Sequence, residues 1–129
     1  MKILGIDYGD RKIGLAFGES SAHMAVPLEV IVNEGEKTFS DLKTLVEQED
    51  IECIVVGVPL SQGNHSSVQL EKTRSFIKTL SETVKVPVYE EDESFTSVES
   101  IRLQQEFQAQ ADEDALAAML IVQSYIDHL

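Results

Sequence analysis

The pattern of apolar and polar positions predicts three strands in the first quarter of the chain. Residues 2–8 and 12–18 are short apolar segments separated by the turn YGDR, a spacing that predicts an antiparallel hairpin. Residues 25–32 predict a third strand, and Pro27 places it at a sheet edge or near a strand start, because proline cannot donate a hydrogen bond to a neighbouring strand.

The rest of the chain alternates between helical and strand patterns. Residues 36–50 have apolar positions at helical spacing, and residues 51–58 are almost continuously apolar, as in a strand covered on both faces. The elements that follow are a helix from about 66 to 84, a strand at 86–89, a helix from about 96 to 107 and a helix at 112–129. This order predicts an α/β fold: a mixed five-stranded sheet flanked by helices, in a single domain over residues 1–129.

Length and composition are those of one cytoplasmic domain. The chain has 129 residues, of which 43% are hydrophobic, and no apolar run approaches the roughly 20 residues of a membrane span. We expect neither a signal peptide nor a membrane contact. The single cysteine, Cys53, lies in an apolar strand pattern and is expected to be a buried thiol.

The charge is strongly negative. There are 23 Asp and Glu residues against 10 Lys and Arg, a formal net charge of −13. Nucleic-acid-binding proteins are usually basic, because contacts with phosphate supply much of their affinity. The acidic balance instead favours a soluble surface, a basic protein partner, or carboxylates that bind metal cations.

Acidic side chains follow the strands that we expect to be parallel. Asp7 ends the strand at 2–8, the 57–66 loop follows the strand at 51–58, and the acidic run 90–93 follows the strand at 86–89. The carboxyl ends of parallel strands meet at one edge of a sheet, where functional crevices lie. We therefore expect these segments to lie side by side.

Each acidic group also has a structural interpretation. Asp7 either begins a turn by accepting hydrogen bonds from backbone amides or is an anion placed for a metal. The run 90–93 is either a solvated charged loop or a set of ligands whose mutual repulsion a divalent cation offsets. Asp112, Glu113 and Asp114 suit the start of a helix, but Asp114 lies one turn before Ala118 and leans inward, where an acid needs a partner or a metal.

Three carboxylates at one sheet edge suit phosphodiester hydrolysis with divalent metal ions, Mg²⁺ or Mn²⁺. His65, in the loop beside this edge, is a candidate contact to phosphate. Three cations on the helix after that loop form either a flanking basic patch or an ordinary solvated face: Lys72, Arg74 and Lys78.

Four segments together resemble the bacterial YqgF family over essentially the whole chain: GIDYGDRKIGLA (5–16), GVPLSQG (57–63), DESFTSVES (92–100) and EDALAAMLIVQSYID (113–127). The resemblance implies an RNase H-like fold. It also implies a metal-dependent endonuclease that acts on structured nucleic acid, by processing the 5′ end of pre-16S rRNA or by cleaving Holliday junctions. An actin-like ATPase shares a segment like GIDYG but needs two such domains.

The resemblance also assigns residues. It implies that the catalytic and metal-binding acids are Asp7, Glu93 and Asp114, with Asp92 as a further candidate ligand. The cationic pair of the first motif is Arg11 and Lys12, which could bind substrate phosphates.

The chain departs from the family pattern where positive charge is expected. Ser94 follows the Asp-Glu motif at a position where the family usually has arginine, and the segment before Asp114 is short and lacks basic residues. A catalytically weak module that binds nucleic acid or protein during ribosome maturation or transcription is therefore the alternative. The choice between RNA and branched DNA, and between monomer and dimer, stays open.

Overall fold

The computed structural model describes residues 1–59, 66–93 and 112–129. The elements run in the order β1 (Lys2–Asp7), β2 (Lys12–Glu19), β3 (Met24–Val32), α1 (Glu36–Gln48), β4 (Cys53–Val58), α2 (Ser66–Thr83), β5 (Val88–Asp92) and α4 (Glu113–Asp127). The helix expected at 96–107 lies outside the described residues.

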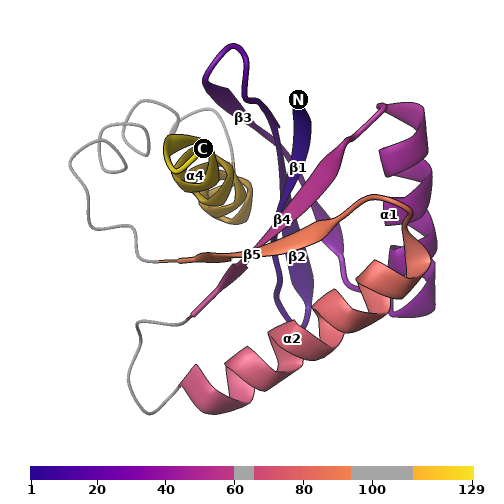
Figure 1. Ribbon diagram of the computed structural model, residues 1–129. Coiled ribbons are helices and arrows are strands. Elements are labelled where there is room, and N and C mark those ends of the chain that lie inside the picture. Colours follow the sequence, from indigo (N-terminus) through magenta and orange to yellow (C-terminus); the bar gives the residue numbers. More distant parts are fainter. Residues whose placement is uncertain (60–65, 94–111) are drawn as a thin grey trace.

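The strands form one five-stranded sheet in the order β3-β2-β1-β4-β5 (Figure 1). β1 pairs with β2 and β2 with β3 in antiparallel fashion, whereas β1, β4 and β5 are parallel neighbours. The predicted mixed sheet and hairpin are confirmed. β3 is an edge strand, as Pro27 indicates.

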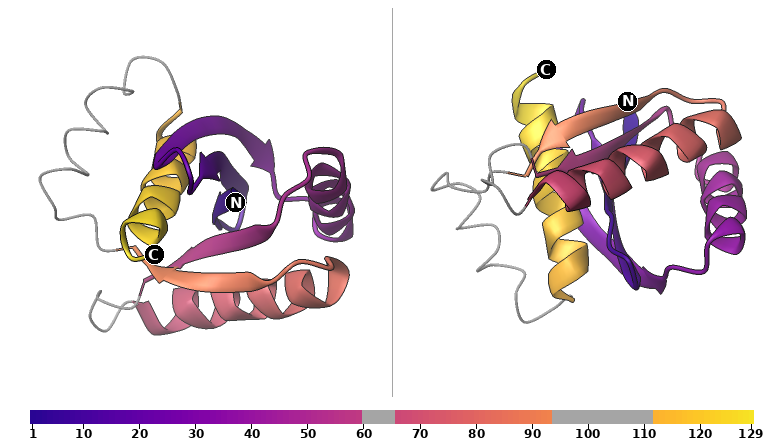
Figure 2. Two further views of the ribbon diagram at one scale, coloured as in Figure 1. Left: turned by 45° about the horizontal axis from the view of Figure 1, so that its top comes forward. Right: turned by 90° about the horizontal axis from the view of Figure 1, so that it is seen from below.

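Helices cover both faces of the sheet. α4 lies on one face and contacts all five strands, while α1 and α2 lie on the other face (Figure 2). The side chains of β1 divide between the two layers, since successive residues of a strand point to opposite faces. Ile3 packs with the buried side of α4, and Leu4 and Ile6 pack with Leu42 of α1 and Leu80 of α2. Among the described residues, no helix is long and apolar enough to cross a membrane.

The boundaries of β5 correct one expectation. The sequence pattern predicts a strand at 86–89 with the acidic run beyond its end, but the strand spans Val88–Asp92 and includes most of that run. Pairing with β4 from Ile54↔Val88 to Val58↔Asp92 decides the boundary. β5 is the other edge of the sheet, and an edge strand tolerates charged side chains that a central strand would exclude.

Candidate active site

Asp7 is the last residue of β1 and lies on the face that α4 covers. It shares this face with Ile3 and Gly5, and a Cβ on Gly5 would collide with Val122 of α4. Asp7 is partly buried, and its backbone neighbour on β2 is Gly14. The carboxyl group therefore lies at the end of the sheet where β1 stops, beneath the start of α4.

The first turn of α4 brings Asp114 to the same place. A Cβ on Gly14 would overlap the backbone carbonyl of Asp114, so only glycine allows the helix to approach β2 this closely. Asp112 is the N-cap residue, but its side chain makes no capping hydrogen bond. Asp114 is half-buried in the first turn, where the helix dipole favours a negative charge.

Glu93 reaches the cluster from the other side. Its backbone N–H donates to Val58 O (3.0 Å), which extends the β4–β5 pairing by one residue. A Cβ on Gly57 would lie 2.8 Å from both Cγ and Oε1 of Glu93. The Glu93 side chain thus passes over Gly57 of β4, the strand that separates β5 from β1.

The electrostatics of Asp7 show that the three acids face one another. Burial raises the pKa of Asp7 first, and a hydrogen bond with Glu93 and the charges of Glu93 and Asp114 raise it further, to about 8. The protonated Asp7 carboxyl is the donor in that hydrogen bond. The structure thus brings together the three acids that sequence reasoning selected, from the end of β1, the residue after β5 and the first turn of α4.

The donor chemistry of this cluster fits a divalent cation. Carboxylate oxygens are the ligands that Mg²⁺ and Mn²⁺ prefer, and bound cations relieve the repulsion among like charges. Within residues 1–59, 66–93 and 112–129, however, no three His, Cys, Asp or Glu side chains are arranged as a complete metal-binding group. Asp7 and Glu93 form a close pair, and Asp114 acts on Asp7 through its charge alone. A cation would have to draw these side chains together.

Asp92 belongs to the other side of β5. Glu90 pairs with Arg74 of α2, whereas Glu91 accepts a hydrogen bond from Ser124 of α4, so alternate residues of this strand face opposite layers. Asp92 is two residues after Glu90 and therefore lies on the same face of the strand, toward α2. This placement favours Glu93 over Asp92 as the acid that meets Asp7.

The candidate phosphate-binding residues are only partly described. Arg11 and Lys12 are exposed beside the hairpin turn that follows Asp7, and no ion pair involves them within the described part of the chain. Lys72 and Arg74 are engaged in ion pairs with Asp10 and Glu90, which weakens the case for a basic patch on α2. His65 and Ser94 lie outside the described residues.

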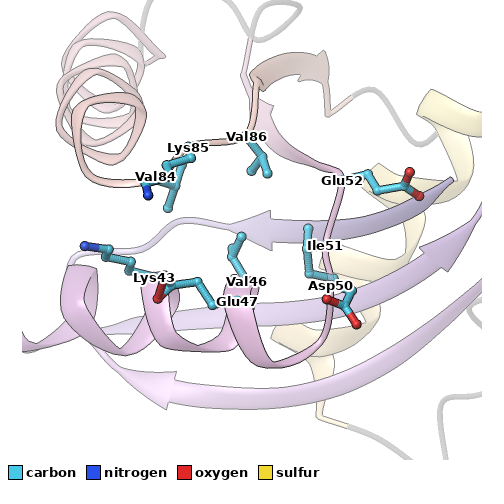
Figure 3. A pocket seen from close by; sticks show the side chains of 9 residues that line it. All are labelled: Lys43, Val46, Glu47, Asp50, Ile51, Glu52, Val84, Lys85 and Val86. Atoms are coloured by element: carbon cyan, nitrogen blue, oxygen red, sulfur yellow. The ribbon is translucent and has the colours of Figure 1, made fainter.

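A cavity of about 370 Å³ lies at the opposite end of the sheet (Figure 3). Its apolar lining includes Val46, Ile51 and Val84, from the end of α1 and the loops before β4 and β5. Lys43 and Lys85 lie at one end of the cavity, and Asp50 and Glu52 lie at the other. This cavity shares no residue with the acidic cluster.

Sequence reasoning missed the residues that shape the cluster. Gly14 and Gly57 allow close approach, and Glu91 is buried against α4. The alternation of the segment YEEDE, with Tyr89, Glu91 and Glu93 on one face, is a signal that could have separated the acids into two sets.

Comparisons with known proteins agree with this architecture. A family model described as "RuvX: Holliday junction resolvase" matches residues 1–128. A Streptococcus mutans protein named "Putative pre-16S rRNA nuclease" is 35% identical over 141 residues, covering 100% of this chain and 99% of its own. A protein of the same name from Koribacter versatilis is 34% identical over 98% of this chain and 86% of its own.

Solved structures share the fold at low sequence identity. Thermus thermophilus RuvC in complex with a Holliday junction substrate superposes with a TM-score of 0.66 at 14% identity, covering 96% of this chain and 91% of that one. The fowlpox virus Holliday junction resolvase has a TM-score of 0.59 at 13% identity and 100% coverage of both chains. The sheet and its helices are thus those of RuvC-type, RNase H-like resolvases, and the chain belongs to the RuvX (YqgF) family.

Proposed function

We propose that this protein is a divalent-metal-dependent endonuclease that cleaves structured nucleic acid, with the 5′ region of pre-16S rRNA or a four-way DNA junction as substrate. The observation that carries the proposal is the convergence of Asp7, Glu93 and Asp114 at one end of the sheet. The resolvase-type fold and the nuclease names of its relatives support it.

In this mechanism Asp7, Glu93 and Asp114 would hold Mg²⁺ or Mn²⁺. When bound, the cation supplies Lewis-acid activation of water and offsets negative charge on the phosphate. Asp7 must release its proton for the cluster to bind a cation, so metal and proton compete for this site. Arg11 and Lys12, exposed beside the hairpin turn after β1, bind flanking phosphates.

The test compares Asp7→Asn with Asp10→Asn. Both variants replace a carboxyl group with an amide in the same hairpin, but Asp10 is exposed and pairs with Lys72. We expect Asp7→Asn to lower the rate of metal-dependent cleavage more than about a hundredfold, on both a precursor rRNA fragment and a four-way DNA junction. Asp10→Asn should keep a rate within about twofold of wild type.

The alternative is a binding module with little catalysis, which the net charge of −13 favours. It predicts that wild type binds a partner without cleaving either substrate in Mg²⁺ or Mn²⁺. Cleavage by Asp7→Asn at the wild-type rate would contradict the proposed site itself.

A further inference from the structure

β5 carries Glu93 to the candidate site, yet it is held to α4 by a polar contact. Its burial pattern is unusual, because Glu91 is its only buried residue and is 8% exposed. Ser124 Oγ of α4 donates to Glu91 Oε2 at 2.6 Å. His128 Nδ1 lies 3.2 Å from the same oxygen.

A buried carboxylate is a costly way to attach a strand to a helix. Moving a charge out of water has a large desolvation penalty, and an apolar residue of similar size would usually pack as stably. What the carboxylate adds is direction: the hydrogen bond from Ser124 Oγ, with His128 Nδ1 near the same oxygen, defines the position of the strand more narrowly than apolar contact does. The ring contact between these elements, Tyr89 on Tyr125, has a centroid distance of 5.9 Å, and Tyr89 is exposed.

The position of Glu91 is directly coupled to that of Glu93. The two residues are next-but-one neighbours on the same face of the strand, so a tilt of β5 away from α4 would move both. Glu91 lies beside Gly57 in the β4–β5 register, and Glu93 passes over the same glycine.

We propose that Glu91, held by Ser124 and His128, is a positioning residue that keeps Glu93 against Asp7. The role in catalysis rests on the proposed function, whereas the effect on the position of Glu93 does not. The contacts assign the three residues a task that lies outside the acidic cluster: they fix the edge strand on which one acid of the cluster depends.

The test removes one hydroxyl and then restores it. Ser124→Ala deletes the shortest contact to Glu91, Ser124→Thr retains a hydroxyl, and Ser40→Ala is the matched control on the exposed side of α1. Metal-free crystal structures of wild type and Ser124→Ala measure the separation of the Asp7 and Glu93 carboxyl groups. We expect a greater separation in Ser124→Ala, and an unchanged separation would overturn the proposal.

Mn²⁺ binding measured by calorimetry, with cleavage kinetics, gives the second readout. Ser124→Ala should weaken Mn²⁺ binding about tenfold and lower kcat with little change in KM, and Ser124→Thr should recover most of both. If Ser124→Ala lowered only the melting temperature and kept the wild-type Mn²⁺ affinity, the contact between Ser124 and Glu91 would be purely structural. That result would contradict the proposal. Absence of cleavage in wild type would defeat the proposed nuclease, while the crystallographic comparison would still decide the positioning role.

Discussion

The two ends of β1 place carboxylates in opposite electrostatic environments. At its start, Glu19 lies 2.7 Å from the N-terminal ammonium of Met1, and Lys2 pairs with Glu49 at 3.3 Å. The hydrogen bond from Met1 lowers the pKa of Glu19 to about 2, with help from Ser21. At its end, burial and two further acids raise the pKa of Asp7 to about 8. The strand between these environments is 6 residues long.

This difference distinguishes the acids that stabilise the fold from the acids of the candidate site. Acids at the start of β1 face cations, which is the arrangement expected where stability alone is selected. Acids at the end face one another in a partly buried place, which destabilises the folded chain unless a cation or a proton intervenes. Strain of this kind concentrates at functional sites, where stability is traded for chemistry.

The largest effect should come from closing the space beneath α4. Gly14→Ala places a Cβ against the carbonyl oxygen of Asp114, which is backbone and cannot rotate away. The first turn of α4 must shift, so we expect a loss of about 3 kcal/mol in the free energy of unfolding, with loss of cleavage. Urea denaturation and activity assays measure the two.

Gly35→Ala is the control for that substitution. Gly35 has a φ of 63°, but no atom lies within 4 Å of the position that a Cβ would occupy, so alanine there meets backbone strain without overlap. Because an L residue is strained at this φ and at a ψ of −123°, we expect a loss of about 1–3 kcal/mol, with full activity. Loss of cleavage in both variants would show that close packing at Gly14 is not the cause.

Asp7→Asn should stabilise the folded chain while it abolishes cleavage. The folded chain keeps the Asp7 proton up to about pH 8, whereas the unfolded chain loses it near 3.8. The folded state therefore binds more protons between these values, and the free energy of unfolding of wild type falls as pH rises from about 4 to 8.

Asparagine carries no titrating group, so the variant lacks this slope. At pH 8 we expect it to exceed wild type by several kcal/mol, an advantage that shrinks by about 1.4 kcal/mol for each pH unit down to about pH 4. Urea denaturation at both pH values measures this difference. If Asp7→Asn were less stable than wild type at pH 8, burial of Asp7 and repulsion among the acids would not be the main effect of Asp7 on stability.

A third substitution tests strain at the opposite end of the sheet. Asp50 follows α1 with a φ of 53°, and the N–H of Ile51 donates to Val46 O at 3.0 Å, which is a Schellman arrangement that favours glycine at position 50. Asp50→Gly should raise the free energy of unfolding by about 0.5–1 kcal/mol. Cleavage should be unchanged, since Asp50 lines the cavity and not the acidic cluster. Thermal denaturation measures the stability and the same cleavage assay measures the activity. A drop in activity would show that the cavity end of the sheet affects the acidic cluster.

Much of this arrangement is predictable from the sequence because it depends on local pattern. The hairpin around YGDR, the buried strand of Cys53 and the position of Asp7 at a strand end all follow from apolar periodicity. The approach of the acidic run 90–93 to Asp7 also follows, once β1, β4 and β5 are taken as parallel. The choice of Glu93 comes from family resemblance, since spacing alone treats the acidic run as one group.

The rest depends on how α4 crosses the sheet, which local pattern does not encode. Gly14 and Gly57 read as ordinary glycines until the helix is seen to approach β2 and the Glu93 side chain is seen to cross β4. The apolar pattern ends β5 too early, because the charged half of this strand is stabilised by pairing with β4 and not by apolar side chains. The role of Glu91 similarly requires Ser124, which is 33 residues away.

The smallest effect concerns the paired acids at the start of β1. Glu19 is partly exposed at the surface, so Glu19→Gln should lower the free energy of unfolding only slightly at neutral pH. Its lowered pKa stabilises the folded chain above about 4.5, and this contribution disappears as pH falls toward 2. Wild type and Glu19→Gln should therefore differ at about pH 6 and converge near about pH 2.5 in urea denaturation. If the stability difference between wild type and Glu19→Gln instead grew as the pH fell, the Glu19 pKa would be raised in the folded chain, as that of Asp7 is. The contrast between the two ends of β1 would then be lost.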